Sequence, residues 1–267
     1  MLKEGCNIEG ADLAIKSLAD MLDFDEIISI DPSRILNEKP LFLKAVSDLN
    51  GRLKQCVQTT QDLGDFPLVF GGDHALAIGS IAGSLTPETG VLWIDAHGDC
   101  NTVTSSPSQR IHGMPLAVLQ GHGHPQLTML NNTILKAKDI LQVGIRSLDE
   151  QEAIQMKEWG VRTITMEDIS TYGFAWMIKE IQLFIADYPK IHISFDCDSI
   201  DPCDAPGVNT PADNGLRIEE ALALLNSLPY AKVFSMDIVE YNPLQDNGKT
   251  KAMILAIDAL VHQKKGV

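Results

Sequence analysis

The sequence predicts an α/β fold in which a mostly parallel sheet lies between two layers of helices. Short, wholly apolar segments such as 67–70 and 91–94 alternate with longer segments of helical periodicity. Strands that are apolar on both faces are typical of parallel sheets covered by helices on each side. In addition, acidic and histidine residues follow several of these segments directly, as expected at the carboxyl ends of strands in such a sheet.

The elements follow one another in a regular order. Apolar residues at three- and four-residue spacing predict a helix over 11–22, and the β-branched run EIISI predicts a strand over 26–30. A long helix over 41–63 ends before Gly64, because glycine favours the left-handed turn that closes a helix. After the strand at 67–70, we expect a helix of small residues at 75–83 and the strand at 91–94. Further strands are expected at 139–143, 162–165, 191–195 and 232–237, and further helices at 149–158, 175–187, 217–227 and 250–263.

The chain reads as a single domain over residues 1–267. It contains no internal repeat, no low-complexity run and no linker that would divide it. Its least regular stretch, residues 98–112, is rich in Ser, Thr, Asn and Pro and lies between a strand and a helix. An α/β enzyme places active-site loops at such positions, so we expect one here.

Composition limits the classes of partner and compartment. The formal net charge of −15 argues against nucleic acid or an anionic membrane, since both require clustered Lys and Arg. No secretory signal or membrane-spanning run is visible. The five cysteines are an odd number without a disulfide-type spacing. A reduced, cytoplasmic compartment and a small-molecule substrate fit these features best.

Three segments carry the candidate chemistry, each placed directly after an apolar strand. They are GGDHALAIGS (71–80), WIDAHGDCN (93–101) and SFDCDSIDP (194–202). Because the carboxyl ends of parallel strands meet at one edge, their side chains are expected to converge. In an extended chain, alternate residues share a face, so the residues between the ligands, Ala96, Gly98 and Cys197, face away. The predicted metal ligands are His74, Asp95, His97, Asp99, Asp196 and Asp198.

Cations explain this gathering of acidic groups better than acidity alone. Four carboxylates at apolar strand ends repel one another and are costly to desolvate, and bound cations remove both problems. Six ligands exceed the needs of one tetrahedral zinc, so a pair of ions about 3.5–4 Å apart is expected. The oxygen-rich ligand set favours Mn²⁺. A lone D-x-H-x-D or D-x-D is usually an ordinary loop, and His122 and His124 are expected to form a polar surface turn rather than a metal site.

At these residues, and at HGMPLA (112–117), the sequence resembles the arginase–agmatinase (ureohydrolase) family from about residue 3 to residue 262. The resemblance implies a three-layer α/β/α fold, two Mn²⁺ per subunit and hydrolysis of a guanidinium group to urea and an amine. It also implies a trimer or hexamer. One ion would be bound by His74, Asp95, Asp99 and Asp196, and the other by His97, Asp95, Asp196 and Asp198, with Asp95 and Asp196 bridging. A hydroxide between the ions would be the nucleophile, held by Asp99; His112 would move protons, and Glu240 would bind the guanidinium.

The resemblance favours L-arginine, hydrolysed to L-ornithine and urea, as the substrate. Substrate contacts are implied for Asn101, Ser108, Arg110, Asp149 and Thr210. Agmatine or a guanidino acid is the alternative substrate, and a pseudoenzyme without turnover is a further alternative.

The chain departs from the family pattern at several places. Gln109-Arg110 stands where Gly-Asn is usual, Ser147 replaces an Asp, and the loop 207–215 differs in its glycines. The family's first strand normally precedes the element found here at 3–5, so the sheet is expected to lack a strand or to have that edge covered otherwise.

Overall fold

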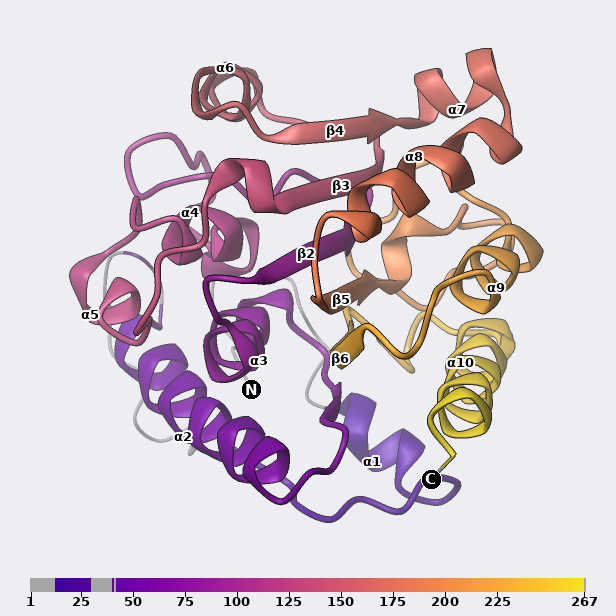
Figure 1. The fold of residues 1–267 in the computed structure, drawn as a ribbon, viewed down its shortest axis with the longest axis horizontal. Helices are drawn as coiled ribbons and strands as arrows, with labels where there is room; N and C mark the ends of the chain where they lie inside the picture. Colours follow the sequence, from indigo (N-terminus) through magenta and orange to yellow (C-terminus); the bar gives the residue numbers. More distant parts are fainter. Residues whose placement is uncertain (1–12, 30–39, 41, 267) are drawn as a thin grey trace.

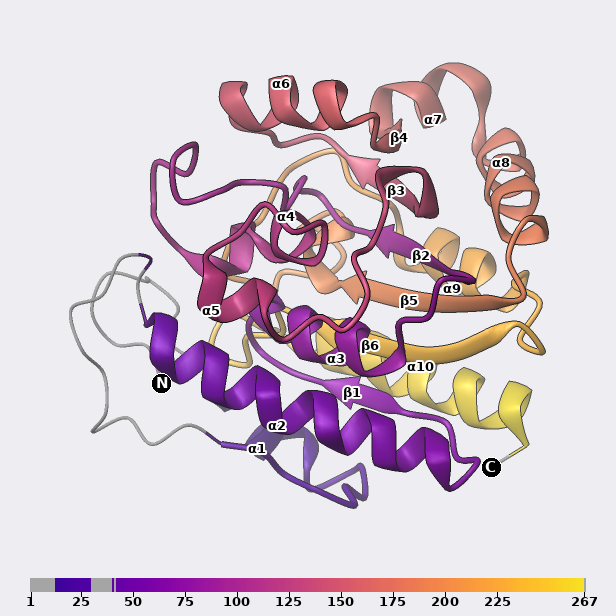
Figure 2. The ribbon, with the colours of Figure 1, turned by 60° about the vertical axis from the view of Figure 1, so that its left-hand side comes forward.

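A computed structural model describes residues 13–29, 40 and 42–266 of the chain. Its centre is a six-stranded sheet in the order β1-β6-β5-β2-β3-β4, and every neighbouring pair of strands is parallel (Figure 1; β1 is labelled in Figure 2). The strands are β1 (Leu68–Phe70), β2 (Thr89–Ile94), β3 (Ile140–Ile145), β4 (Arg162–Thr165), β5 (Lys190–Asp196) and β6 (Val233–Val239). The predicted parallel sheet is therefore confirmed, and six of the seven predicted strands lie where expected.

Helices cover both faces of the sheet. In Figure 1, α8, α9 and α10 lie on the right-hand face and α3, α4 and α6 on the left. Figure 2 shows the long helix α2 outside α3, which lies between α2 and the sheet. The helices are α1 (Ala14–Leu18), α2 (Leu43–Asp62), α3 (Ala77–Ser84), α4 (Pro115–Leu119), α5 (Pro125–Thr128), α6 (Glu150–Trp159), α7 (Met166–Tyr172), α8 (Phe174–Ala186), α9 (Ile218–Asn226) and α10 (Lys249–Lys265). Short 3₁₀ turns are η3 (His74–Leu76), η4 (Ile111–Gly113), η5 (Ala137–Asp139) and η6 (Cys197–Ser199).

The alternation of side chains along β2 shows why its sequence is apolar throughout. Leu92 and Ile94 pack into the core formed with α8, α9 and α10. Val91 and Trp93 point to the opposite face and pack with α3, α4 and α6. Because both faces are covered by helices, successive residues of a central strand are all buried.

Two expectations at the start of the chain are changed. Residues 26–29 form no strand, so that part of the predicted strand 26–30 is wrong, and residue 30 lies outside the described residues. Ile27 is 57% exposed, while Phe24 packs edge-on against Phe70 of β1. β-branched composition favours a strand only where a neighbouring strand and a packed face are available. The predicted helix 11–22 is described only from residue 13 and is regular only over α1.

Two short helices, α5 and α7, were not expected, and α4 is the helix expected after the loop 98–112, although its bounds were not predicted. Each of these three helices has four to seven residues, too few to show helical periodicity. Their starting signals are present: a proline begins α4 and α5, and a capping box between Thr165 and Asp168 begins α7. No helix within residues 13–29 and 42–266 is long and apolar enough to cross a membrane. The sequence element at 3–5 and any strand before it lie outside the described residues.

Candidate metal centre

The carboxyl ends of three strands bring the predicted ligands together. β1 leads to His74, β2 to the segment 95–99, and β5 to Asp196 and the turn after it. The His74 Nδ1 atom lies 2.9 Å from Asp196, 3.2 Å from Asp99 and 3.3 Å from Asp95. On the other side, the His97 Nδ1 atom lies 3.1 Å from Asp198 and 3.6 Å from Asp95. All six predicted metal ligands therefore surround one small region.

The ligand atoms form two groups that share one residue. His74, Asp95 and Asp196 offer atoms within 4.8 Å of one another, and so do Asp95, His97 and Asp198. Asp95 belongs to both groups, as expected of a bridging carboxylate. Although the His74 Nδ1 atom is surrounded by carboxylates, it is buried and makes no hydrogen bond. A buried imidazole nitrogen in this situation fits a cation as its missing partner.

The backbone at the ligands differs from the extended geometry that the sequence predicted. Asp99 has a positive φ of 50°, and residues 197–199 form the turn η6. Asp95 Oδ1 accepts the His97 amide at 2.7 Å, and Asp196 Oδ1 accepts the Asp198 amide at 2.7 Å. These tight turns satisfy backbone donors that an extended strand end would leave unpaired. The ligands converge through turns, and the prediction of an extended D-x-D was wrong.

The residues between the ligands do face away. Ala96 and Cys197 are fully buried, and the Cys197 side chain packs into the apolar core. Gly98 lies so close to α6 that a Cβ there would meet the Met156 Sδ atom at 2.7 Å. Larger side chains at Gly98 would therefore push α6 away from the site.

A second set of residues fixes the orientation of the ligands. The indole of Trp93 donates to Asp95 Oδ2 at 2.8 Å, and Thr210 donates to Asp198 Oδ2 at 3.0 Å. Such outer contacts set the orientation and basicity of metal ligands.

A buried chain of hydrogen bonds continues behind His74. Its Nε2 atom lies 2.8 Å from Ser194 Oγ, which donates to Asp237 Oδ1 at 2.5 Å. Asp237 Oδ2 lies 2.9 Å from His192 Nε2, and the two carboxylate oxygens thus have different partners. Ser194, Asp237 and His192 were not among the residues predicted from the sequence. The signal was present, because polar residues recur at every second position inside two otherwise apolar strands.

Electrostatics shows that the site needs positive charge. Burial and the charges of Asp198 and Asp95 raise the pKa of Asp196, and burial with Asp95 raises the pKa of Asp99 to about 6. Burial disfavours charged imidazoles, yet the neighbouring carboxylates raise the pKa of His74 and His97. Without a metal, the site therefore gains protons, and cations are expected to displace them.

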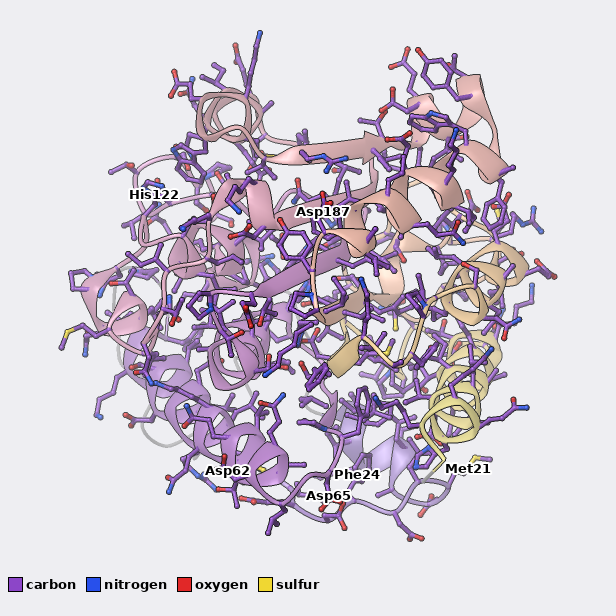
Figure 3. The ribbon with its side chains drawn as sticks, in the orientation of Figure 1. Met21, Phe24, Asp62, Asp65, His122 and Asp187 are labelled. Atoms are coloured by element: carbon purple, nitrogen blue, oxygen red, sulfur yellow. The ribbon has the colours of Figure 1, made fainter. Side chains whose placement is uncertain are left out.

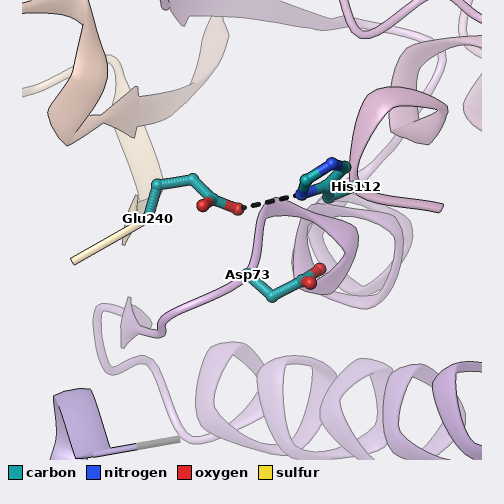
Figure 4. Close-up of side chains that lie close together, drawn as sticks. All are labelled: Asp73, His112 and Glu240. Carbon is teal, nitrogen blue, oxygen red and sulfur yellow. Dashed lines mark ion pairs between the residues drawn. The ribbon is translucent and has the colours of Figure 1, made fainter. Parts of the chain in front are cut away.

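Glu240 lies beside the metal ligands, after β6, and has an unusual environment. It has a positive φ of 60° and accepts the His74 backbone amide through Oε1 at 2.7 Å. Its Oε2 atom is buried and has no hydrogen-bond partner. Figure 4 shows its carboxylate pointing toward His112, whose Nδ1 atom is 3.7 Å away, with Asp73 below them. Burial opposes the charged form of His112, but Glu240 and then Asp73 raise its pKa to about 9.

A pocket opens from the metal ligands toward the irregular loop 98–112. Five of the predicted substrate contacts line this pocket: Asn101, Ser108, Asp149, Thr210 and Glu240. His112 lines it as well, whereas Arg110 is not among the lining residues. Asn101 donates to Asp149 at 3.0 Å, and Asp149 caps α6. The loop predicted to belong to an active site therefore lines the pocket beside the predicted metal ligands.

Glu152 also lines the pocket, and sequence analysis missed it. It accepts the backbone amides of Cys100 at 2.9 Å and Asp149 at 3.3 Å. Burial, and then the charge of Asp99, raise its pKa to about 7. The D-x-x-E spacing of a capping box at 149–152 was the available signal.

The predicted surface turn at 121–125 is found. His122 lies at the edge of the molecule, where its ring stacks on Trp159 at 4.2 Å (Figure 3). His124 caps α5 by accepting the Gln126 amide. Neither histidine belongs to a metal-ligand group among the described residues.

An α/β sheet whose carboxyl edge gathers two imidazoles and four carboxylates beside a polar pocket is the arrangement expected of a metal-dependent hydrolase. The model of the Arginase family matches residues 8–263, and the chain belongs to this family. It is accordingly a ureohydrolase, a hydrolase that acts on linear amidines.

Characterised relatives support this assignment over most of their length. Arginase from Bacillus caldovelox is 40% identical over 222 residues, covering 80% of this chain and 74% of the relative. Arginase from Bacillus subtilis is 38% identical over 245 residues, covering 89% and 83%. The fold is similar to that of Entamoeba histolytica arginase in complex with L-ornithine, with a TM-score of 0.87, 32% identity and coverage of 94% and 92%.

Proposed function

We propose that this chain hydrolyses L-arginine to L-ornithine and urea, using two Mn²⁺ ions. The observation that carries this proposal is the arrangement of the pocket. A buried, unpartnered carboxylate oxygen of Glu240 lies at the metal end, and hydroxyl, amide and carboxylate groups lie at the other end. A substrate with a guanidinium group at one end and an amino-acid group at the other fits these two ends of the pocket. The names of the similar arginases support the same substrate.

Glu240 is proposed to bind the guanidinium. Its Oε1 atom is already fixed by the His74 amide, so the carboxylate has a set orientation before the substrate binds. The free Oε2 atom can accept a charge-assisted N–H bond from a group that is always cationic. Because the carboxylate is buried, it discriminates strongly against a substrate that leaves it unpaired.

At the metal end of the pocket, the side chains proposed to take part in hydrolysis lie close together. Two divalent ions would neutralise the carboxylates and lower the pKa of a bound water. Asp99, beside His74, is proposed to orient that nucleophile. His112 faces Glu240 across 3.7 Å and is positioned to give a proton to the amine that leaves.

At the far end, polar groups are proposed to bind the amino-acid part of the substrate. Asn101 and Ser108 can donate to the α-carboxylate, and Asp149 can accept from the α-amine. Thr210 is proposed to contribute to substrate binding indirectly, because its hydroxyl donates to Asp198 and fixes that carboxylate. Arg110 stays a predicted substrate contact, with its backbone amide donating to Ser108 Oγ at 3.3 Å.

Urea release from three substrates tests this function. Metal-loaded protein is mixed with L-arginine, agmatine or 4-guanidinobutyrate, and the initial rate is measured at several concentrations. We expect kcat/KM to be highest for L-arginine. A higher kcat/KM for agmatine or 4-guanidinobutyrate would show that this compound, and not L-arginine, is the substrate. If none of the three compounds released urea, a pseudoenzyme would be favoured.

We also infer a homo-oligomer, a trimer or a hexamer, that works in the cytoplasm without nucleic-acid or membrane partners. The family resemblance and the net charge of −15 support this inference. Light scattering of the purified protein measures the number of subunits.

A further inference from the structure

Gln109 occupies a backbone conformation that its side chain does not favour. Its φ is 59°, in the left-handed region where the Cβ atom of an L residue crowds the backbone. Non-glycine residues stay in this region only where their surroundings hold them there. The position lies in the loop beside the pocket, and contacts within this loop hold it.

Three hydrogen bonds connect Gln109 to residues three and six positions earlier. Its side-chain Nε2 atom donates to the carbonyl oxygens of Val103 and Ser106, both at 2.7 Å. Its backbone amide donates to Ser106 Oγ at 3.0 Å. Both hydrogens of the side-chain amide are thus used within the loop. Gln109 therefore joins the second half of the loop, which carries Ser108, to the first half, which carries Val103 and Ser106.

The first half of this loop is itself fixed to the body of the protein. Gln155 of α6 donates to the Cys100 carbonyl at 3.1 Å and to Ser105 Oγ at 3.2 Å. Ser105 in turn donates to Asn101 Oδ1 at 2.9 Å. The second half carries the exposed Ser108. Because Gln109 is bonded to the first half, the exposed second half is held in place as well.

The hydrogen bonds also determine what the nearby hydroxyls can do. Ser106 Oγ accepts the Gln109 amide, and Ser108 Oγ accepts the Arg110 amide at 3.3 Å. The two hydroxyls lie 3.4 Å apart, and both residues line the pocket. Each hydroxyl accepts an N–H and keeps its own hydrogen; without a ligand one hydroxyl can donate to the other, and both hydrogens can rotate toward a bound acceptor. Two adjacent donors at the end of the pocket suit a carboxylate group.

We propose that Gln109 is a positioning residue that holds Ser106 and Ser108 as a carboxylate-binding pair. It thereby favours guanidinium substrates that carry a carboxylate over those that do not. This inference rests on the proposed function, because it assumes that the guanidinium lies at Glu240 and the rest of the substrate toward the loop.

Two substitutions test the role of the side-chain amide. Gln109→Glu keeps the size but places an oxygen against two carbonyls, and Gln109→Gly keeps the left-handed backbone but removes the amide. Gln263→Glu, at an exposed position of α10, controls for the added charge. For each protein, kcat and KM are measured with L-arginine. Agmatine binding is measured as its inhibition constant against L-arginine, and thermal unfolding checks the fold.

We expect both Gln109 variants to raise KM for L-arginine about tenfold, with kcat changed less than about twofold and agmatine binding unchanged. The control should match the wild type. An unchanged KM for L-arginine, or an equal weakening of L-arginine and agmatine, would overturn the role of Gln109. If the wild type released no urea from L-arginine, the proposed function itself would fail; a KM effect limited to another guanidino acid would keep the role of Gln109 and change the substrate.

Discussion

At the scale of single residues, His74 shows how the fold prepares a ligand. Its Nε2 atom lies 2.8 Å from Ser194 Oγ, while Nδ1 faces three carboxylates. Asp237 accepts the hydroxyl hydrogen of Ser194, so Ser194 has its lone pairs left for an N–H of His74. This arrangement favours the tautomer that keeps Nδ1 unprotonated and available for a metal.

Ser194→Ala tests this preparation of His74. The variant removes the acceptor at Nε2 and should weaken metal affinity by about 10–100-fold, as loss of such outer contacts usually does. Titration of metal-free protein with Mn²⁺ measures the affinity. Ser227→Ala, at an exposed position after α9, is the matched control and should bind metal like the wild type. Equal affinity in the Ser194 variant and the wild type would contradict the assigned role.

His112 predicts a pH dependence of stability in the metal-free protein. Glu240 raises the pKa of His112 from 6.5 to about 9 in the folded state. Folding therefore favours the protonated form, so the stabilisation is complete below pH 6.5 and is lost as the pH rises through 9. At about 1.4 kcal/mol per pKa unit, the loss is roughly 3 kcal/mol.

The measurement compares wild type with His112→Asn, which cannot titrate in this range. Denaturant unfolding of both proteins without metal gives the free-energy difference at several pH values. The free energy of unfolding of the wild type, relative to that of His112→Asn, should decrease as the pH rises from 6.5 to 9. A difference that is independent of pH would show that the ion pair with Glu240 does not form.

Single residues also show which parts of the site could be predicted from the sequence and which could not. The convergence of the six candidate metal ligands was predictable because they follow apolar strands at regular spacing. Ser194 and Asp237 left a signal, as polar residues at every second position of apolar strands, but their pairing is known only when the neighbouring strand is known. Glu152 was hidden by its second role, since a helix cap and a pocket carboxylate have the same sequence pattern.

At the scale of elements, two glycines allow α3 to approach α2 closely. A Cβ at Gly79 would lie 2.5 Å from the Asn50 carbonyl oxygen, and one at Gly83 would lie 2.8 Å from that of Lys54. The Gly79 amide donates to Asn50 Oδ1 at 2.6 Å, so the contact is polar as well as close. Because α3 follows His74 directly, this packing helps to place the ligand.

Gly79→Ala should therefore destabilise the protein by about 1–3 kcal/mol, since the methyl group forces the helices apart. Gly51→Ala is a matched control on α2, because its Cβ would meet only Leu130 at the ordinary distance of 3.7 Å. That variant should be as stable as the wild type or more stable by about 0.5–1 kcal/mol, owing to the better helix propensity of alanine. Equal destabilisation by both variants would show that helix packing is not the cause.

The elements that the sequence predicted well are those with a strong physical signal. Strands buried on both faces give uninterrupted apolar runs, and long helices give clear periodicity. Residues 26–29 failed because their composition is that of a strand while no neighbouring strand pairs with them among the described residues. The extended geometry predicted at 196–198 was wrong because Asp196 Oδ1 accepts the amide two residues later, and Asp99 departs from extended geometry through its positive φ.

At the scale of the whole molecule, we expect folding and metal binding to be coupled. The folded chain collects four carboxylates, which the unfolded chain keeps apart, and burial makes their repulsion costly. A ligand that binds only the folded state stabilises it in proportion to the logarithm of its concentration. The single-domain interpretation of residues 1–267 stays a prediction, and one cooperative unfolding transition would agree with it.

Removal of metal should lower Tm, and addition of Mn²⁺ should restore it. Above saturation, each tenfold rise in free Mn²⁺ should add about 1.4 kcal/mol of stability per bound ion. Asp196→Ala, which removes one ligand, should reduce this response. Calorimetry at graded Mn²⁺ concentrations measures it, and a Tm that is insensitive to chelation in the wild type would argue against a metal site in this fold.

The central claim, arginine hydrolysis at a two-ion site, is tested most directly by measuring urea release from L-arginine against the number of Mn²⁺ ions bound per chain. We predict no activity in metal-free protein and full activity only at two bound ions per chain. Full activity without metal, or none in protein that holds two ions, would contradict the claim.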